Sequence, residues 1–303
     1  MAMSVDWADL AIRLSDQVQV LSTSDNGAYP SGNTVVVQGA GETVVIDPSV
    51  TVVDKGGVGL PVDAVINSHG HEDHIAGNGL FPDARIHIHE LDLPVTQSVD
   101  GLLALTGHTQ QSSPALTSLY LEEFHYCPRP DANGFADGHV WDLGGVEIEA
   151  VHLPGHTQGH CGFRISDGVF FLSDIDLTGF GPYYGDVFSS LDQFEASLEL
   201  VRDEDARFYV TFHHKGIIEG RDRFRELLDA FASVIPRRHT AMLEFLQEPH
   251  TLQEMVAHRF VYRPHVELEI ADRVEARTAE LHVERMLDRG EIEELGDGLL
   301  RAC

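Results

Sequence analysis

One short segment limits what this chain can fold into more than any other: residues 67–74, which read NSHGHEDH. Three histidines and two acidic residues lie close together there, directly after the apolar run VDAVI at residues 62–66. That run is rich in β-branched residues and is bounded by turn formers, so it predicts a short buried strand. The histidines would then lie on the loop at which a rigid strand ends. Imidazole and carboxylate groups are ligands that zinc and similar cations prefer.

Three other predicted strands end in loops with the same kind of side chain. They are residues 146–152 before His156, residues 169–173 before Asp174, and residues 207–212 before His213 and His214. If the four loops converge, they supply ligands for two metal ions, with Asp174 as a carboxylate between them. The alternative, that residues 67–74 are a solvated loop, is disfavoured because few sequences reach this spacing by accident.

The combined pattern, HxHxDH at residues 69–74 followed by three more ligand-type residues, resembles the metallo-β-lactamase fold superfamily over about residues 15–235. Its order and spacing are similar to those of the glyoxalase II-like hydrolases. The resemblance implies an α/β fold, an αββα sandwich, with a dinuclear site along the edge of two packed sheets. By this resemblance the first metal ion is held by His69, His71 and His156, the second by Asp73, His74 and His213, and Asp174 bridges the two.

Two positions of the pattern stay open. The family usually has glycine before the bridging aspartate, whereas this chain has Ser173, so a displaced bridge with Asp176 as the alternative ligand is kept. His213 and His214 are adjacent, and we favour His213 because it comes first after the strand. True β-lactamases with a second zinc ion commonly carry cysteine where this chain has Asp174, so the pattern disfavours penicillin hydrolysis as the main activity.

A site of this kind implies hydrolysis. Two cations about 3.5–4 Å apart can share a hydroxide and lower its pKa towards neutrality, so no serine or cysteine nucleophile is needed. This metal-bridging hydroxide would cleave an ester, thioester, lactone or phosphodiester, with Asp73 as a ligand that also carries a proton to the leaving group. Zinc is the default among the two divalent ions, although iron or manganese would fit the same ligands. A non-catalytic ligand sensor is disfavoured, and an iron-dependent oxygenase of persulfides is a minor alternative.

Several residues outside the ligand set also have a predicted place. Asp47 ends a predicted strand and is suited to support the metal loop by hydrogen bonds. His87 and His89 lie on one face of another strand, and we interpret them as structural because no carboxylate is near them in the sequence. Residues 91–135 are an insertion that either caps the pocket as a lid or pads the core, and we favour the lid. The aromatic residues of 177–186 either line the pocket or pack under a glycine-rich loop.

Residues 236–303 are predicted to form a second, mostly helical domain after a catalytic domain at residues 1–235. Its helices, followed by a hairpin at residues 291–298, resemble the winged-helix appendage of the β-lactamase-like endoribonucleases. A metal-dependent endoribonuclease acting on single-stranded RNA is therefore the main alternative function. The formal net charge of −29 argues against it, and acids outnumber arginines between residues 272 and 289, whereas a nucleic-acid reader needs a basic face. We interpret this domain as a packing or dimerisation element, with a second role as a wall of the pocket kept as an alternative, and a homo-oligomer stays open.

Composition predicts the compartment. Among 303 residues there are three cysteines, which is no disulfide framework and is typical of a reducing compartment. The first six residues show no basic region followed by an apolar core, so we expect no signal peptide. No uncharged apolar run approaches the roughly 20 residues of a membrane span. These features predict a cytoplasmic protein without a membrane partner. The candidate site predicts a small-molecule substrate, and the acidic net charge disfavours nucleic acid as a partner.

Overall fold

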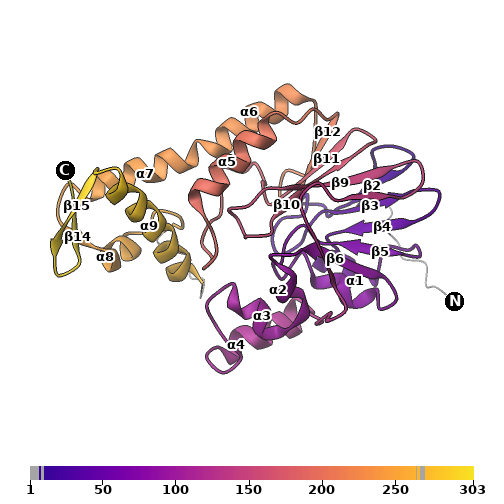
Figure 1. Ribbon diagram of the computed structural model, residues 1–303, viewed down its shortest axis with the longest axis horizontal. Helices are drawn as coiled ribbons and strands as arrows, with labels where there is room; N and C mark the ends of the chain where they lie inside the picture. Colours follow the sequence, from indigo (N-terminus) through magenta and orange to yellow (C-terminus); the bar gives the residue numbers. More distant parts are fainter. Residues whose placement is uncertain (1–6, 8–9, 264, 267–269) are drawn as a thin grey trace.

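Two β-sheets packed face to face form the centre of the computed structural model (Figure 1). The structure describes residue 7 and residues 10–263, 265–266 and 270–303. The first sheet contains, in chain order, β1 (Ala11–Arg13), β2 (Val18–Leu21), β3 (Thr34–Gln38), β4 (Thr43–Ile46), β5 (Ala64–Ile66), β6 (Arg85–His89) and β7 (Asn133–Phe135). The second sheet contains, from edge to edge, β13 (Ile217–Glu219), β12 (Phe208–Thr211), β11 (Val169–Ser173), β10 (Cys161–Ile165), β9 (Glu147–His152) and β8 (Val140–Asp142).

Strand pairing in the first sheet brings two predicted site segments to one edge. β1 to β4 pair antiparallel, whereas β4, β5, β6 and β7 pair parallel. Ile46 at the end of β4 lies opposite Ile66 at the end of β5. Asp47 and the loop that follows Ile66 therefore leave the sheet side by side. The predicted strand at residues 62–66 is confirmed in the shorter form Ala64–Ile66.

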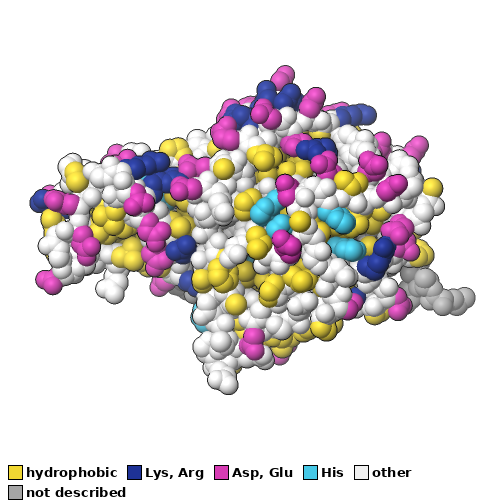
Figure 2. Space-filling view, viewed as in Figure 1, with side chains coloured by type: hydrophobic (Ala, Val, Ile, Leu, Met, Phe, Trp, Pro, Cys, Tyr) yellow, Lys and Arg dark blue, Asp and Glu magenta, His cyan; other side chains and the backbone are white. Residues whose placement is uncertain are grey.

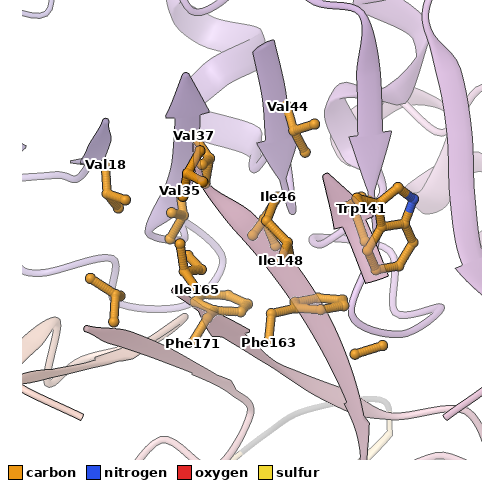
Figure 3. Close-up of a cluster of buried hydrophobic side chains, with 14 of the residues drawn as sticks. Val18, Val35, Val37, Val44, Ile46, Trp141, Ile148, Phe163, Ile165 and Phe171 are labelled. Carbon is orange, nitrogen blue, oxygen red and sulfur yellow. The ribbon is translucent and has the colours of Figure 1, made fainter. Parts of the chain in front are cut away.

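The main hydrophobic core lies between the two sheets. Val35, Val37 and Ile46 point inward from the first sheet and meet Phe163 and Phe171 of the second, as Figure 3 shows. All five side chains have a relative exposure of 0%. Complete burial of one such side chain stabilises the fold by about 1.5–3 kcal/mol, so the core fixes the strand ends that carry the site.

Helices cover the outer faces of both sheets. α1 (Val50–Lys55) packs on the first sheet through Val52, and α5 (Leu191–Arg202) and α6 (Arg221–Ala232) cover the second sheet. α5 begins after Ser190, whose side chain accepts a hydrogen bond from the backbone of the first turn. The layers therefore follow the order αββα, which confirms the predicted fold class.

The insertion at residues 91–135 packs directly against the predicted metal loop. It contains α2 (Leu93–Gln97), α3 (Val99–Ala104), α4 (Pro114–Ser118) and the helical turn η3 (Leu119–Glu123), and the turn η2 (Ala76–Leu80) precedes it. Leu102, Tyr120 and Phe124 form a hydrophobic cluster with Ile75, which follows the loop. A Cβ atom added at Gly70 would lie 2.7 Å from Cγ1 of Val95, so glycine is required there. The insertion thus packs against one side of the loop. Its role as a lid stays a prediction.

The C-terminal part extends away from the sandwich (Figure 1). It consists of α7 (Val234–Phe245), α8 (Leu252–His258), α9 (Ala271–Asp288) and a small sheet in the order β14 (His250–Thr251), β16 (Leu299–Ala302) and β15 (Ile292–Gly296). The expected boundary after residue 235 falls inside α7. Ile235 packs in the cluster under the second sheet, whereas Met242 packs in the C-terminal cluster. The division into two domains at this position stays a prediction.

Within the described residues, no helix has both the length and the apolar composition that a membrane span requires. The first six residues, on which the expectation of no signal peptide was based, lie outside the described residues.

Candidate metal centre

Asp47 ties the histidine-rich loop to the end of the neighbouring strand. Its Oδ1 atom accepts a hydrogen bond from the backbone N–H of Ser68 at 2.7 Å. Its Oδ2 atom lies 2.8 Å from Nδ1 of His74 and 2.5 Å from the hydroxyl of Ser68. The side chain of Asp47 is completely buried. The predicted supporting role of Asp47 is therefore confirmed, and it leaves Nε2 of His74 directed at the site.

The first group of ligand-type atoms comes from three loops. His69, His71, His156 and Asp174 each contribute one nitrogen or oxygen atom, and these atoms all lie within 4.8 Å of one another. Nδ1 of His71 lies 2.9 Å from Nε2 of His69 and 3.0 Å from Nε2 of His156. Nitrogen atoms that face one another in this way are typical of a cation site.

The second group lies next to the first. Asp73, His74 and His213 also present one atom each within 4.8 Å of one another. Oδ2 of Asp73 lies 2.9 Å from Nε2 of His213. Asp174 lies between the groups, because its Oδ1 atom is 3.0 Å from Nε2 of His74 and its Oδ2 atom is 3.1 Å from Nε2 of His156. One carboxylate thus presents one oxygen to each group.

Three of these atoms are buried without a hydrogen-bond partner among the described residues. They are Oδ2 of Asp73, Nε2 of His74 and Oδ1 of Asp174. Buried polar atoms in folded proteins are nearly always hydrogen-bonded, and an unpaired one costs free energy. All three would be satisfied by a cation between them, so the residues present fit divalent metal ions.

The acidic and histidine side chains of the two groups shift one another's pKa values. Burial raises the pKa of Asp174, but His74 and His156 beside it hold the pKa well below its usual range. Burial lowers the pKa of His74, whereas Asp174 and Asp73 raise it, and the pKa lies well above its usual value overall. Burial also lowers the pKa of His213, but Asp73 raises it to about 9 overall. Metal binding therefore has to release protons from these imidazoles.

The side chains that orient the first group are not those that sequence analysis singled out. Nε2 of His71 lies 2.6 Å from Oδ2 of the buried Asp186, and Nδ1 of His156 lies 2.9 Å from the carbonyl oxygen of Tyr183. Both partners belong to the loop at residues 177–189, in which only the aromatic residues had been noted. Its Tyr183 ring does lie at the site, with its centroid 6.1 Å from that of His71.

Asp92 is a second missed residue. Its carboxylate accepts hydrogen bonds from the backbone of Gly70 at 3.1 Å, the hydroxyl of Thr157 at 2.7 Å and the backbone of Gly159 at 2.9 Å. The side chain therefore joins the loop that carries His69 to the loop that carries His156. Asp92 follows β6, so the rule that polar residues at strand ends approach the site could have identified it.

The fold, the two groups of ligand-type atoms and their order along the chain can be compared with known proteins. The family model of the metallo-beta-lactamase superfamily matches residues 29–214, which is more than half of the chain. The chain belongs to this superfamily. The residues that the sequence resemblance proposed as metal ligands lie together in the structure, in two neighbouring groups.

Relatives and solved structures are similar to this superfamily member only at low identity. An uncharacterized protein of Mycobacterium tuberculosis is 28% identical over 149 residues, which are 46% of this chain and 61% of that protein. A hydroxyacylglutathione hydrolase of Aeromonas salmonicida is 26% identical over 141 residues, which are 45% of this chain and 43% of that enzyme. The chain thus spans less than two thirds of the length of these relatives. A metallo-beta-lactamase family protein of Thermus thermophilus has the same fold, with a TM-score of 0.72 at 21% identity over 96% of this chain and 100% of that one.

The structure also separates the alternatives left open at two positions of the superfamily pattern. Ser173 has a φ angle of 52°, a left-handed conformation that favours glycine. Its hydroxyl lies 2.7 Å from that of Ser68, and Asp174 still reaches both groups. The carboxylate of Asp176 instead accepts hydrogen bonds from Thr178 and belongs to neither group.

His213, and not His214, takes part in the second group. Nδ1 of His213 donates to the carbonyl oxygen of Gly27 at 3.0 Å, which directs Nε2 towards Asp73. His214 is exposed. His89 stacks on His152 with the ring centroids 4.2 Å apart, and neither belongs to a candidate metal group in the part of the chain that the structure describes.

Hydrophobic side chains surround the histidines that reach the surface on the face shown in Figure 2. Near the second group, the ring of the exposed Tyr29 lies 5.8 Å from that of His213 and 6.3 Å from that of Phe124 in the insertion. The insertion therefore contributes to the surroundings of the site through aromatic contact. Acidic side chains also lie near the first ligand group, since Glu72 and Asp186 flank His71.

Proposed function

We propose that this chain is a metal-dependent hydrolase that binds two divalent ions, zinc by default, and cleaves an ester, thioester or lactone of a small molecule. The observation that carries the proposal is the position of Asp174, with one oxygen facing each ligand group. His69, His71 and His156 would hold the first ion, and Asp73, His74 and His213 the second. Two ions held there would supply Lewis acidity and an activated water molecule at neutral pH.

The chain's own residues would then bind substrate and move the proton. Asp73 is the candidate for carrying a proton to the leaving group, because its Oδ2 atom is buried at the site, 2.9 Å from Nε2 of His213. Tyr183 and Tyr29 flank opposite groups and offer aromatic surface to an organic acyl moiety. The name of the Aeromonas relative, hydroxyacylglutathione hydrolase, supports an acyl substrate.

The C-terminal part is the feature that keeps the ribonuclease alternative in view. Its order of helix, strand, two helices and two strands, from α7 to β16, is that of a winged helix, and we propose that residues 236–303 form such a domain. Two arginines of α9, however, are engaged by acids, since Arg285 pairs with Asp192 and Glu195, and Arg273 pairs with Asp186. Side chains held in this way are poorly placed to bind phosphates. We therefore favour a small acyl substrate, with a packing or self-association role for this domain.

The experiment that tests the function is reconstitution. The full-length chain is stripped with a chelator, reloaded with zinc, manganese or iron, and assayed on thioesters, lactones, aryl esters and single-stranded RNA. We expect hydrolysis of at least one class of acyl substrate that depends on added metal. RNA cleavage without acyl hydrolysis would make the endoribonuclease reading correct instead.

A further inference from the structure

Two of the three histidines in the first group depend on a single loop. Asp186 orients His71 through the 2.6 Å contact with its Nε2 atom, and the carbonyl oxygen of Tyr183 orients His156. Ser189 adds a second tie, because its hydroxyl donates to the carbonyl oxygen of His156 at 2.7 Å and accepts from the backbone of Asp186 at 3.1 Å. A displacement of residues 183–189 would therefore turn both imidazoles.

Helix α9 of the C-terminal part holds this loop in place. Arg273 donates to Oδ1 of Asp186 at 3.2 Å, and Arg277 donates to the carbonyl oxygen of Ser189 at 3.2 Å. A Cβ atom added at Gly185 would lie 2.6 Å from Cγ1 of Val274, so helix and loop are in close contact. Figure 1 shows α9 beside the segment that precedes α5. The helix thus contacts the same loop that orients His71 and His156.

The second group has no such dependence in the part of the chain that the structure describes. His74 is oriented by Asp47 after β4, and His213 by the carbonyl oxygen of Gly27. These partners belong to the N-terminal half of the sandwich. His71 and His156 therefore have supports separate from those of His74 and His213, although the two groups share Asp174. The third histidine of the first group, His69, lies 3.1 Å from the hydroxyl of Ser68, which Asp47 also contacts.

We propose that Asp186 and Arg273 are positioning residues for the first metal ion, so that helix α9 sets the metal affinity of the three-histidine group. This inference rests on the proposed metal centre. The Nε2–H of His71 donates to Asp186, which leaves the lone pair of Nδ1 directed at His69 and His156. Arg273 donates to the other oxygen of the same carboxylate and so fixes its orientation beside the imidazole. The C-terminal part is then a component of the site.

The magnitude follows from the general behaviour of residues that orient metal ligands. Loss of such a partner typically weakens metal binding by about 10–100-fold. Asp186→Asn removes the charge but keeps the shape, so we expect a loss in that range. Arg273 acts through Asp186 and is itself partly exposed, so we expect a loss of about threefold to tenfold for Arg273→Met, at or below the low end of that range.

The test uses the full-length chain and zinc alone in two single-site backgrounds. His213→Ala disables the second group, and His71→Ala disables the first. Zinc affinity is measured by competition with a chromophoric chelator, with and without Arg273→Met or Asp186→Asn. We expect each change to weaken zinc binding in the His213→Ala background and to leave it within about twofold in the His71→Ala background, since the second group has separate supports.

Arg285→Met is the matched control, because Arg285 also lies on α9 and pairs with acids of the sandwich, Asp192 and Glu195. Among the described residues it makes no hydrogen bond or ion pair with residues 183–189. We expect unchanged zinc affinity in both backgrounds. Equal losses in both backgrounds, no loss with Arg273→Met, or the same loss with Arg285→Met would overturn the inference. Circular dichroism of the metal-free variants separates this effect from unfolding, and Arg273→Met decides the test if Asp186→Asn does not fold.

Failure of the positioning role can be distinguished from failure of the proposed hydrolase function. A wild-type chain that binds zinc but cleaves no ester, thioester or lactone overturns the function and leaves the positioning role standing. A chain that cleaves these substrates while Arg273→Met and Asp186→Asn keep the zinc affinity of the first group overturns the positioning role alone.

Discussion

The two halves of the candidate metal centre are built on different kinds of support. His74 is oriented by Asp47, which lies 27 residues earlier in the chain at the end of a paired, buried strand. His71 is oriented by Asp186, which lies 115 residues later on a loop that helix α9 holds. One half is therefore fixed by the sandwich core, and the other by the contact between the sandwich and the C-terminal part. The difference suggests that the first ion is the one whose affinity can be altered from a distance.

The largest effect is expected when a ligand itself is removed. Asp174→Ala should abolish turnover and weaken both ions, because this carboxylate faces both groups. His71→Ala should also abolish turnover but should weaken only the first ion. Both losses should exceed the roughly 10–100-fold typical of supporting residues. Metal content and hydrolysis of the same samples check this, and full activity in either folded variant would contradict the two-ion account.

The next effect is the loss of affinity for the second ion when its own supporting carboxylate, Asp47, is changed. Asp47→Asn should weaken the second ion by about 10–100-fold, because it removes the charge and one of the two acceptor oxygens that hold Ser68 and His74. Zinc affinity measured in the His71→Ala background shows the loss, and the His213→Ala background serves as control. A larger loss in the control background would mean that the two halves do not have separate supports.

A steric change at the contact between helix and loop tests the comparison without touching a ligand or a charge. Gly185→Ala places a Cβ atom 2.6 Å from Cγ1 of Val274. Overpacking of this kind typically costs about 1–3 kcal/mol, and we expect weaker binding of the first ion as well. Urea unfolding and zinc affinity are the measurements. Gly179→Ala is the matched control in the same loop, because a Cβ atom there would meet no atom within 4 Å.

Relief of the clash provides the second part of this test. Val274→Ala combined with Gly185→Ala removes the two methyl groups that lie 2.6 and 3.0 Å from the added Cβ atom, so the double variant should regain zinc affinity relative to Gly185→Ala alone. If the double variant is as weak as the single one, the close contact between α9 and the loop does not control the first group.

A last effect, on stability and not on metal affinity, concerns the pH dependence of the contact between α9 and the loop. His282 of α9 lies 3.1 Å from the hydroxyl of Tyr184, and burial lowers its pKa to about 3. The unfolded chain, with a histidine pKa of about 6.5, binds more protons than the folded chain between these two values. The contribution to the free energy of unfolding is therefore present above pH about 6.5 and is lost as the pH falls towards 3, by up to about 1.4 kcal/mol per pH unit.

Urea unfolding of wild type and His282→Gln at several pH values between 7 and 4 measures this contribution. The variant keeps a polar side chain but cannot take up a proton, so its stability should fall less steeply than that of wild type. Parallel curves would show that His282 does not titrate as its burial indicates.

The same comparison explains what could be predicted from the sequence. The ligand residues and Asp47 all follow apolar strands, and strand ends in packed sheets meet at a common edge, so their convergence and the αββα fold could be inferred from local patterns. Asp92 also follows a strand, β6, but only His87 and His89 of that segment were considered as candidate ligands. Asp186 and Tyr183 could not be found in this way, because an irregular loop has no periodicity that shows where its side chains point.

The contact of α9 with the loop was equally invisible in the sequence. The periodicity of the helix predicts a buried face, but it does not name the surface that covers this face. Val274 and Gly185 are far apart in the sequence. They come into contact because α7, which links the sandwich to the C-terminal part, brings α9 back to the loop. Sequence analysis therefore predicted a packing or dimerisation element, whereas in the structure α9 contacts the loop that orients His71 and His156.

The most direct measurement is the number of zinc ions per chain after equilibrium dialysis at buffered free zinc, for wild type, Asp186→Asn and Asp47→Asn. The account predicts two ions per wild-type chain and the loss of a single, different ion in each variant, which the His71→Ala and His213→Ala backgrounds identify. One ion or none per wild-type chain, or loss of the same ion in both variants, would contradict a two-ion centre with separate supports.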